Sequence, residues 1–309
     1  MASKARNTDP RYSQLTVGTA PDSWGVWFPE DDKQVSWTTF LDEVAEAGYE
    51  VIETGPFGFL PTDPEVLMAE CARRGITVVA GTQFGVLHRA EDWDTTEAEM
   101  RANAAVLKAV GAHYLVYLPP MLRDLQTGGW AEDPNLSDDD LALFAANANR
   151  LGKLLKDDYD VTMVVHPHGD SHLETREQID RFFAATDPEY VSFCLDTGHL
   201  EYGEVDTVDL IKSYPDRIGL VHIKQMDPAI VQKVRQEDLS FGEAVSLGVC
   251  VTPDGGQPKV AAVIEALADL DKELYVIVEQ DLYPCAPDVP LPLAIETRRV
   301  LAENNLGLL

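Results

Sequence analysis

Two apolar segments of this chain end in pairs of polar residues that are separated by one residue. One segment runs into His166-Pro167-His168, and another runs into His222-Ile223-Lys224. Residues two apart on an extended strand point to the same side, so each pair is expected to face one common space. A carboxylate follows two further apolar segments, at Asp196 and at Glu279.

This mixture of imidazoles and carboxylates is typical of a divalent metal site. His166, Asp196, His222 and Glu279 are the predicted ligands, with His168 as the alternative to His166. Two imidazoles favour a transition ion over Mg²⁺, because Mg²⁺ takes mainly oxygen ligands. We expect Mn²⁺ or Co²⁺, with Zn²⁺, Fe²⁺ or Mg²⁺ as alternatives. A cation also offsets the cost of burying several ionisable groups together.

The segments that carry these residues alternate with amphipathic stretches along the whole chain. Eight strand candidates are followed by helix candidates, and several of these helices are expected to end at a glycine, as at Gly111. Eight β-then-α units in one chain predict a closed (β/α)8 barrel, an α/β TIM barrel, as a single domain over residues 15–309. A doubly wound open sheet is the alternative, but no G-x-G-x-x-G follows the first strand. Residues 1–14 are expected to form a disordered lead-in.

In a (β/α)8 barrel the carboxyl ends of the strands and the loops after them form the active site. The polar residues expected at these positions are Glu53, Gln83, Tyr117, His166, His168, Asp196, His199, His222, Lys224, Glu279, Gln280 and Asp281. Two connections exceed the usual length, residues 20–36 and 224–257, which favours a functional role for both. Trp24, Trp27 and Phe57 are expected to line the pocket, although core packing explains Trp27 equally well.

Some of the polar residues also have purely structural interpretations that require no metal or substrate. His113, His88 and His172 are expected to be structural residues that form hydrogen bonds. The segment Asp196-Thr197-Gly198-His199 also fits an Asx turn that begins a helix, and this is compatible with a ligand role for Asp196.

Composition excludes several classes of protein. The 309 residues carry a formal net charge of −29, which disfavours a nucleic-acid surface and makes a neutral polyol a better substrate than an anion. Four widely spaced cysteines and no secretory signal at the start of the chain favour a reduced, cytoplasmic protein. No apolar run is long enough to span a membrane. A symmetric homodimer or homotetramer is expected.

The motifs resemble those of the xylose-isomerase-like TIM barrels, over nearly the whole chain. The resemblance is carried by Leu195–His199, Val221–Lys224 and Val278–Asp281. Within that superfamily, residues 20–25, 166–169 and 279–281 are most similar to the branch that dehydrates 2-keto-myo-inositol. The usual metal set is Glu, Asp, His and Glu, and His166 stands where the first Glu is usual. The common His-x-Lys-Asp reads His222-Ile223-Lys224-Gln225 here, with Asp227 as a candidate for the missing acid.

The resemblance implies a metal-dependent lyase that eliminates water from a keto-cyclitol or keto-sugar. Epimerases of this superfamily use two metal-bound glutamates, and only Glu279 remains here, which favours elimination. Glu279 or His199 would act as the base, Lys224 would stabilise the enolate, and His168 would protonate the departing hydroxyl. Contacts to substrate are expected from Trp24, Glu53, Phe57, Gln83 and Tyr117. An isomerase or epimerase is the second interpretation, and a non-catalytic sugar-binding barrel the third.

Overall fold

The computed structural model describes residues 9–125 and 127–307, and it confirms the predicted (β/α)8 barrel. Eight parallel strands close into a cylinder in which β1 pairs with β10 along five residues, from Leu15 with Leu274 to Thr19 with Val278. The barrel strands are β1 (Leu15–Thr19), β2 (Val51–Pro56), β3 (Thr77–Phe84), β4 (Tyr114–Leu118), β5 (Thr162–Val165), β6 (Val191–Asp196), β7 (Ile218–Ile223) and β10 (Leu274–Val278).

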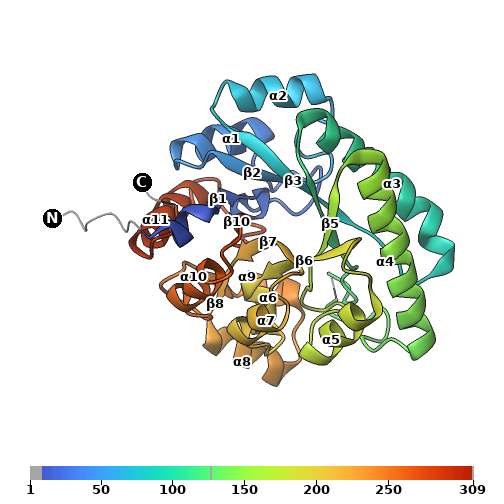
Figure 1. Cartoon of the computed structure of the whole chain (residues 1–309). Helices are drawn as coiled ribbons and strands as arrows, with labels where there is room; N and C mark the ends of the chain where they lie inside the picture. Colours follow the sequence, from blue (N-terminus) through green and yellow to red (C-terminus); the bar gives the residue numbers. More distant parts are fainter. Residues whose placement is uncertain (1–8, 126, 308–309) are drawn as a thin grey trace.

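Helices surround the cylinder, as Figure 1 shows. Those in the eight β-then-α units are α1 (Trp37–Glu46), α2 (Pro64–Ala72), α3 (Trp93–Val110), α4 (Asp138–Tyr159), α5 (Arg176–Ala185), α6 (Thr197–Tyr202) with α7 (Thr207–Ser213), α10 (Val260–Ala268) and α11 (Pro290–Glu303). The predicted glycine stop after α3 is present, since Gly111 adopts a left-handed conformation with φ 77°.

The barrel interior is a layer of apolar side chains below its carboxyl end. Residues of the layer include Val51, Val116, Val164, Cys194, Leu220 and Ile277, from six different strands. Because side chains alternate along a strand, the residue two positions after each of them also points inward, one layer closer to the mouth. The composition of that next layer therefore decides what chemistry the barrel offers.

The chain before the barrel is more ordered than predicted. Pro10–Gln14 form a 3-10 helix, η1, capped by Asp9 and held by contacts of Arg11 and Tyr12 with Glu265 of α10. The expectation of disorder is therefore wrong for this segment, because these side chains dock on a neighbouring helix. Residues 1–8 lie outside the described part of the chain.

The expected long loop over residues 224–257 is a small folded unit. It contains β8 (Gln225–Met226), α8 (Pro228–Glu237), α9 (Phe241–Ser246) and β9 (Cys250–Val251), with a core of its own that includes Phe241. A capping box between Ser240 and Glu243 begins α9. The connection after β1 is also partly ordered, as the 3-10 helix η2 (Pro21–Trp24).

Among residues 9–125 and 127–307, no helix is both long and apolar enough to cross a bilayer. All four cysteines are free thiols.

Candidate metal centre and cavity

Four candidate ligands occupy the layer immediately above the apolar interior. His166, Asp196, His222 and Glu279 each stand two residues after an inward-facing apolar residue, namely Val164, Cys194, Leu220 and Ile277. Strand alternation thus places all four side chains inside the mouth of the barrel. Asp196 and His222 are also direct partners in the pairing of β6 with β7.

The four side chains converge. Each offers one ligand atom, and these atoms all lie within 4.8 Å of one another. His166 Nε2 lies 3.3 Å from Asp196 Oδ2, and His222 Nδ1 lies 3.1 Å from Glu279 Oε2 and 3.7 Å from Asp196 Oδ2. An ion bound at this point would contact donors from four consecutive strands of the barrel.

Two imidazole nitrogens in this group lack hydrogen-bond partners. His166 Nδ1 and His222 Nδ1 are buried, and no described residue forms a hydrogen bond with either, because the nearby Glu279 oxygen is misaligned with the His222 ring. Buried polar atoms are almost always paired, so such nitrogens require another partner. A divalent cation between the carboxylates satisfies His222 Nδ1, receives Nε2 of His166 and offsets the charge of two carboxylates, so the residues fit the metal site that the sequence predicts.

Glu53 orients the central ligand. Its Oε2 lies 2.9 Å from His222 Nε2, and its other oxygen accepts a hydrogen bond from Thr82. With Nε2–H donated to Glu53, Nδ1 is the nitrogen of His222 that faces the carboxylates. Glu53 also lines the cavity, but its main contact is with this imidazole.

Because Glu53 fixes that ring, the Glu53→Gln variant is expected to bind the metal about 10–100-fold more weakly. The amide can still accept from Thr82, so the fold should be retained. Titration of the metal-free protein with Mn²⁺ or Co²⁺ measures the change. Gln83→Glu, a change at the cavity rim, is the matched control, and equal affinities for wild type and Glu53→Gln would contradict the orienting role.

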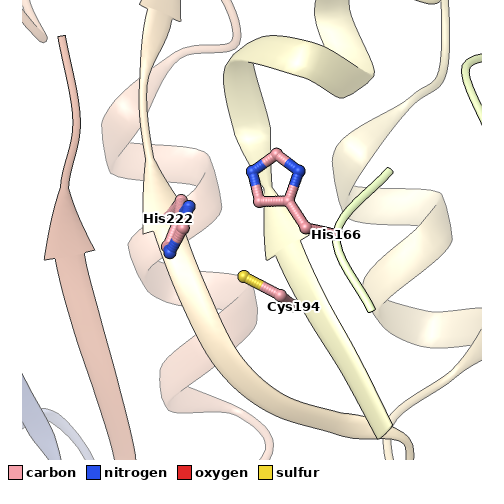
Figure 2. A group of neighbouring side chains, drawn as sticks. All are labelled: His166, Cys194 and His222. Atoms are coloured by element: carbon pink, nitrogen blue, oxygen red, sulfur yellow. The ribbon is translucent and has the colours of Figure 1, made fainter. Parts of the chain in front are cut away.

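Cys194 offers an alternative set of ligands. Figure 2 shows its sulfur near the imidazoles of His166 and His222, and one atom from each of the three lies within 4.8 Å of the others. Burial raises the pKa of Cys194 to about 12, so it is a neutral thiol rather than the thiolate that binds metals. It also belongs to the apolar layer below the site. The carboxylate set is therefore the better candidate.

The Cys194→Ala variant separates these two sets. If the carboxylates hold the ion, this variant should keep the metal content of the wild type, whereas Asp196→Asn should lose it. Elemental analysis of both purified variants gives the answer. The reverse result, with metal lost from Cys194→Ala and kept by Asp196→Asn, would assign the ion to the thiol set.

Asp196 has two separate functions through its two oxygens. Oδ1 accepts from the backbone N–H groups of Gly198 and His199, both at 2.8 Å, and so begins α6. Oδ2 faces His166, His222 and Lys224. The expected Asx turn and the expected ligand position therefore occur in one side chain. The following Gly198 is required by close approach, since a Cβ there would lie 2.5 Å from Lys224 Cγ.

Lys224 is a buried cation among carboxylates. Its Nζ lies 3.3 Å from Asp196, 3.0 Å from Glu279 and 2.8 Å from Asp281. Burial opposes the charged form, but these three carboxylates outweigh it and raise the pKa of Lys224 well above its ordinary value. Asp281 thus takes the position expected for an acid beside the lysine, whereas Asp227 caps α8.

His168 and His199 are held by hydrogen bonds, and that of His168 assigns its tautomer. His168 Nδ1 lies 2.8 Å from the Gly169 carbonyl, which assigns its proton to Nδ1. Burial lowers the pKa of His168 to about 3 and that of His199 well below its usual range. His199 Nδ1 accepts from Gly169 N–H at 3.0 Å, and its Nε2 lies 3.2 Å from Lys224 Nζ. Neither predicted role is favoured, because His168 has no proton to donate into the cavity and both nitrogens of His199 already face hydrogen-bond donors.

A cavity of about 750 Å³ opens above the candidate ligands. This is the size of a small-molecule site. The ligand layer forms its floor, and Phe57, Gln83 and Trp27 line it together with Phe241 of α9. Trp27 is held in place by its Nε1–H, which donates to Asp281 Oδ1 at 2.9 Å.

Two predicted substrate contacts are wrong. Tyr117 follows inward-facing Val116 by one residue, so it points outward, packs near Phe144 and donates to the Gly85 carbonyl at 2.8 Å. Trp24 packs edge-on against Phe40, and its Nε1–H donates to Glu43 of α1 at 2.8 Å. Neither residue belongs to the cavity lining found in the described chain.

Asp22 is a cavity residue that the sequence reasoning missed. It lines the cavity, and its two buried oxygens have no hydrogen-bond partner among residues 9–125 and 127–307. Burial, together with nearby Glu279 and Asp281, raises the pKa of Asp22 well above its usual value. The sequence reasoning selected Trp24 from this segment, and Asp22 gave no signal because it lies in the 3-10 helix η2, where strand alternation does not apply.

Comparison with known proteins identifies the family of this chain. The family model described as a xylose isomerase-like TIM barrel matches residues 41–302. The chain belongs to this family. An inosose dehydratase of Clostridium botulinum (strain Eklund 17B / Type B) is 28% identical over 295 residues, covering 94% of this chain and 97% of the relative. One of Geobacillus thermodenitrificans (strain NG80-2) is 28% identical over 298 residues, covering 95% and 98%.

Solved structures share the fold at lower identity. The IOLI protein, crystallised with a binding zinc atom, matches with TM-score 0.70 and 16% identity over 94% of this chain and 99% of its own. The probable 3-DHS dehydratase AsbF from Bacillus anthracis matches with TM-score 0.69 and 12% identity, over 93% and 98%. The resemblance stated from the motifs, to this family and its inosose dehydratase branch, is confirmed.

Proposed function

We propose that this protein is a metal-dependent dehydratase that removes water from a keto-cyclitol, with 2-keto-myo-inositol as the first candidate substrate. The observation that carries the proposal is the asymmetric layer at the barrel mouth. Among the four candidate ligands Glu279 is the one glutamate, and it has a buried lysine at its side. The match to inosose dehydratases along nearly the whole chain supports the same reaction.

The donor set would hold the ion at His166, Asp196, His222 and Glu279. When bound, a divalent ion supplies Lewis-acid polarisation of the substrate ketone, which acidifies the neighbouring C–H bond. The cavity above the ligands is large enough for a six-membered ring, and Trp27 and Phe57 offer apolar surface to its C–H faces.

Glu279 is the base that we assign. Burial alone would raise its pKa, but His222 and Lys224 outweigh burial and lower the pKa to about 2, so the carboxylate is ionised at neutral pH. It takes the proton from the carbon beside the ketone, and the electrons of that C–H bond form an enolate. The ammonium of Lys224, 3.0 Å from Glu279, stabilises the negative charge that develops.

Asp22 is the proton donor that we assign in place of His168. Burial beside Glu279 and Asp281 raises its pKa, which favours the protonated form, and it lines the same cavity. As the enolate electrons form the new double bond, the C–O bond at the β carbon breaks, and the departing hydroxyl takes the Asp22 proton to leave as water. The hydroxyl that remains on the double bond is an enol, which tautomerises to a 1,2-dione.

The test is a reaction in D₂O with 2-keto-myo-inositol and a panel of keto-sugars, each with and without Mn²⁺ or Co²⁺. We expect an ultraviolet-absorbing dione whose mass is lower by one water and which contains solvent deuterium. A product of unchanged formula that contains deuterium would instead establish an epimerase or isomerase. Binding without turnover of any substrate would favour a non-catalytic sugar-binding barrel.

A further inference from the structure

A second group of possible metal ligands lies outside the cavity. His88, Glu132 and His172 come from the connections after β3, β4 and β5, and one ligand atom of each lies within 4.8 Å of the others. The two histidines are 5% and 3% exposed. The cavity lining in the described chain includes none of the three residues.

The hydrogen bonds of the two imidazoles leave one nitrogen on each ring without a partner. His172 Nδ1 lies 3.1 Å from the Pro134 carbonyl, which assigns its proton to Nδ1 and its lone pair to Nε2. His88 Nε2 lies 3.2 Å from Glu132 Oε2. His172 Nε2 and His88 Nδ1 are both buried, and neither has a hydrogen-bond partner in the part of the chain described.

Side-chain packing does not explain why each of these two imidazoles has a buried nitrogen without a hydrogen-bond partner. The rings meet edge to face with centroids 4.5 Å apart, and the lone pair on His172 Nε2 has no donor among the described residues. A buried acceptor without a donor is destabilising. Burial also lowers the pKa of His172, which keeps that ring in the neutral form that binds metals.

We propose that His88, Glu132 and His172 form a second site, for Zn²⁺ or a similar transition ion. Two imidazoles and one carboxylate are a zinc-type donor set, and one pair of these atoms, His88 Nε2 and Glu132 Oε2, already lies 3.2 Å apart, close to the roughly 3.3 Å between ligands bound tetrahedrally at about 2.0–2.1 Å. The Pro134 carbonyl holds the His172 ring as outer partners of metal-binding histidines do. Glu132 is partly exposed, which leaves an approach for water as the fourth ligand.

The position of this site indicates a structural role. The three connections that it joins also line the cavity, through Gly85 and Val86 after β3, Met121 and Arg123 after β4, and His168 after β5. An ion held between them would fix the cavity wall without contacting the substrate. This differs from the ligand layer, where the ion would contact the reacting atoms.

The test counts ions in the full-length protein after equilibration with Zn²⁺ and removal of free metal. We expect two ions per chain in the wild type, one in His172→Gln, and two in His113→Gln, which changes an exposed histidine. In a His222→Ala background, which removes the first site, we expect one ion, and none once His172→Gln is added. A visible Co²⁺ spectrum from the His222→Ala protein should disappear with the same second change.

These variants distinguish the second site from the ligand layer. Equal metal content in the wild type and His172→Gln would overturn the proposal, as would a His222→Ala protein that binds no ion. If the ligand layer at the barrel mouth binds no ion, the wild type should still bind one ion per chain, and His172→Gln should remove it. If His172→Gln does not fold, Glu132→Gln removes a partly exposed ligand from the same site, and retention of its full metal content and Co²⁺ spectrum would count against the site equally.

Discussion

Replacing His222 by alanine is expected to remove the ion of the cavity and the turnover together. Nδ1 of this residue lies between Asp196 and Glu279, while its other nitrogen is held by Glu53. Loss of the central ligand leaves two carboxylates and one imidazole, and a missing Lewis acid costs several kcal/mol of transition-state stabilisation. We therefore expect kcat/KM to fall about 10³-fold or more.

Elemental analysis and steady-state kinetics on the same preparation check this result. His113→Ala is the control, because its side chain is 65% exposed at the opposite end of the barrel, where β4 begins. The variant at His222 should contain one ion fewer per chain than the control. Retention of both the ion and the turnover in His222→Ala would show that the assignment of ligands is wrong.

Replacing Lys224 by methionine is expected to leave the ion bound but to slow the reaction. The side chain is 2% exposed and its ammonium contacts three carboxylates, so methionine keeps the shape and removes the charge. Loss of one preorganised group that stabilises developing charge costs about 10²–10³ in kcat. We expect a decrease of that size with little change in metal content.

The same variant should be less stable when metal is absent. Removing one partner from a buried ion pair costs about 3–5 kcal/mol, because the remaining charges are left uncompensated. Denaturant unfolding with and without Mn²⁺ measures this, and added metal should restore part of the loss. Lys156→Met is the control, since Lys156 pairs with Glu189 on the surface. Unchanged kcat and unchanged metal-free stability in Lys224→Met would contradict the role that we assign to the ammonium.

Much of the site was predictable because it follows from two simple rules. Polar residues at the carboxyl ends of barrel strands identify the mouth, and strand alternation selects which of them face inward. Both rules agree for His166, Asp196, His222 and Glu279. They disagree for Tyr117, which stands at a strand end but one position out of phase with Val116, and the structure follows the alternation.

The remaining features depend on contacts between segments far apart in the chain. Glu53 and His222 are separated by 169 positions, and only the closed barrel brings β2 and β7 to one centre. Trp24 is directed outward by the turn of η2, to which no periodicity applies. The capping box at Ser240 was available in the sequence and would have predicted α9.

The most direct test of the ligand layer is anomalous diffraction from crystals of the wild-type protein grown with Mn²⁺ or Co²⁺. We expect a peak at the mouth of the barrel, about 2.0–2.2 Å from nitrogen or oxygen atoms of His166, Asp196, His222 and Glu279. If the saturated protein shows no peak there, or an ion at the mouth bound by other residues, the account of this centre is wrong.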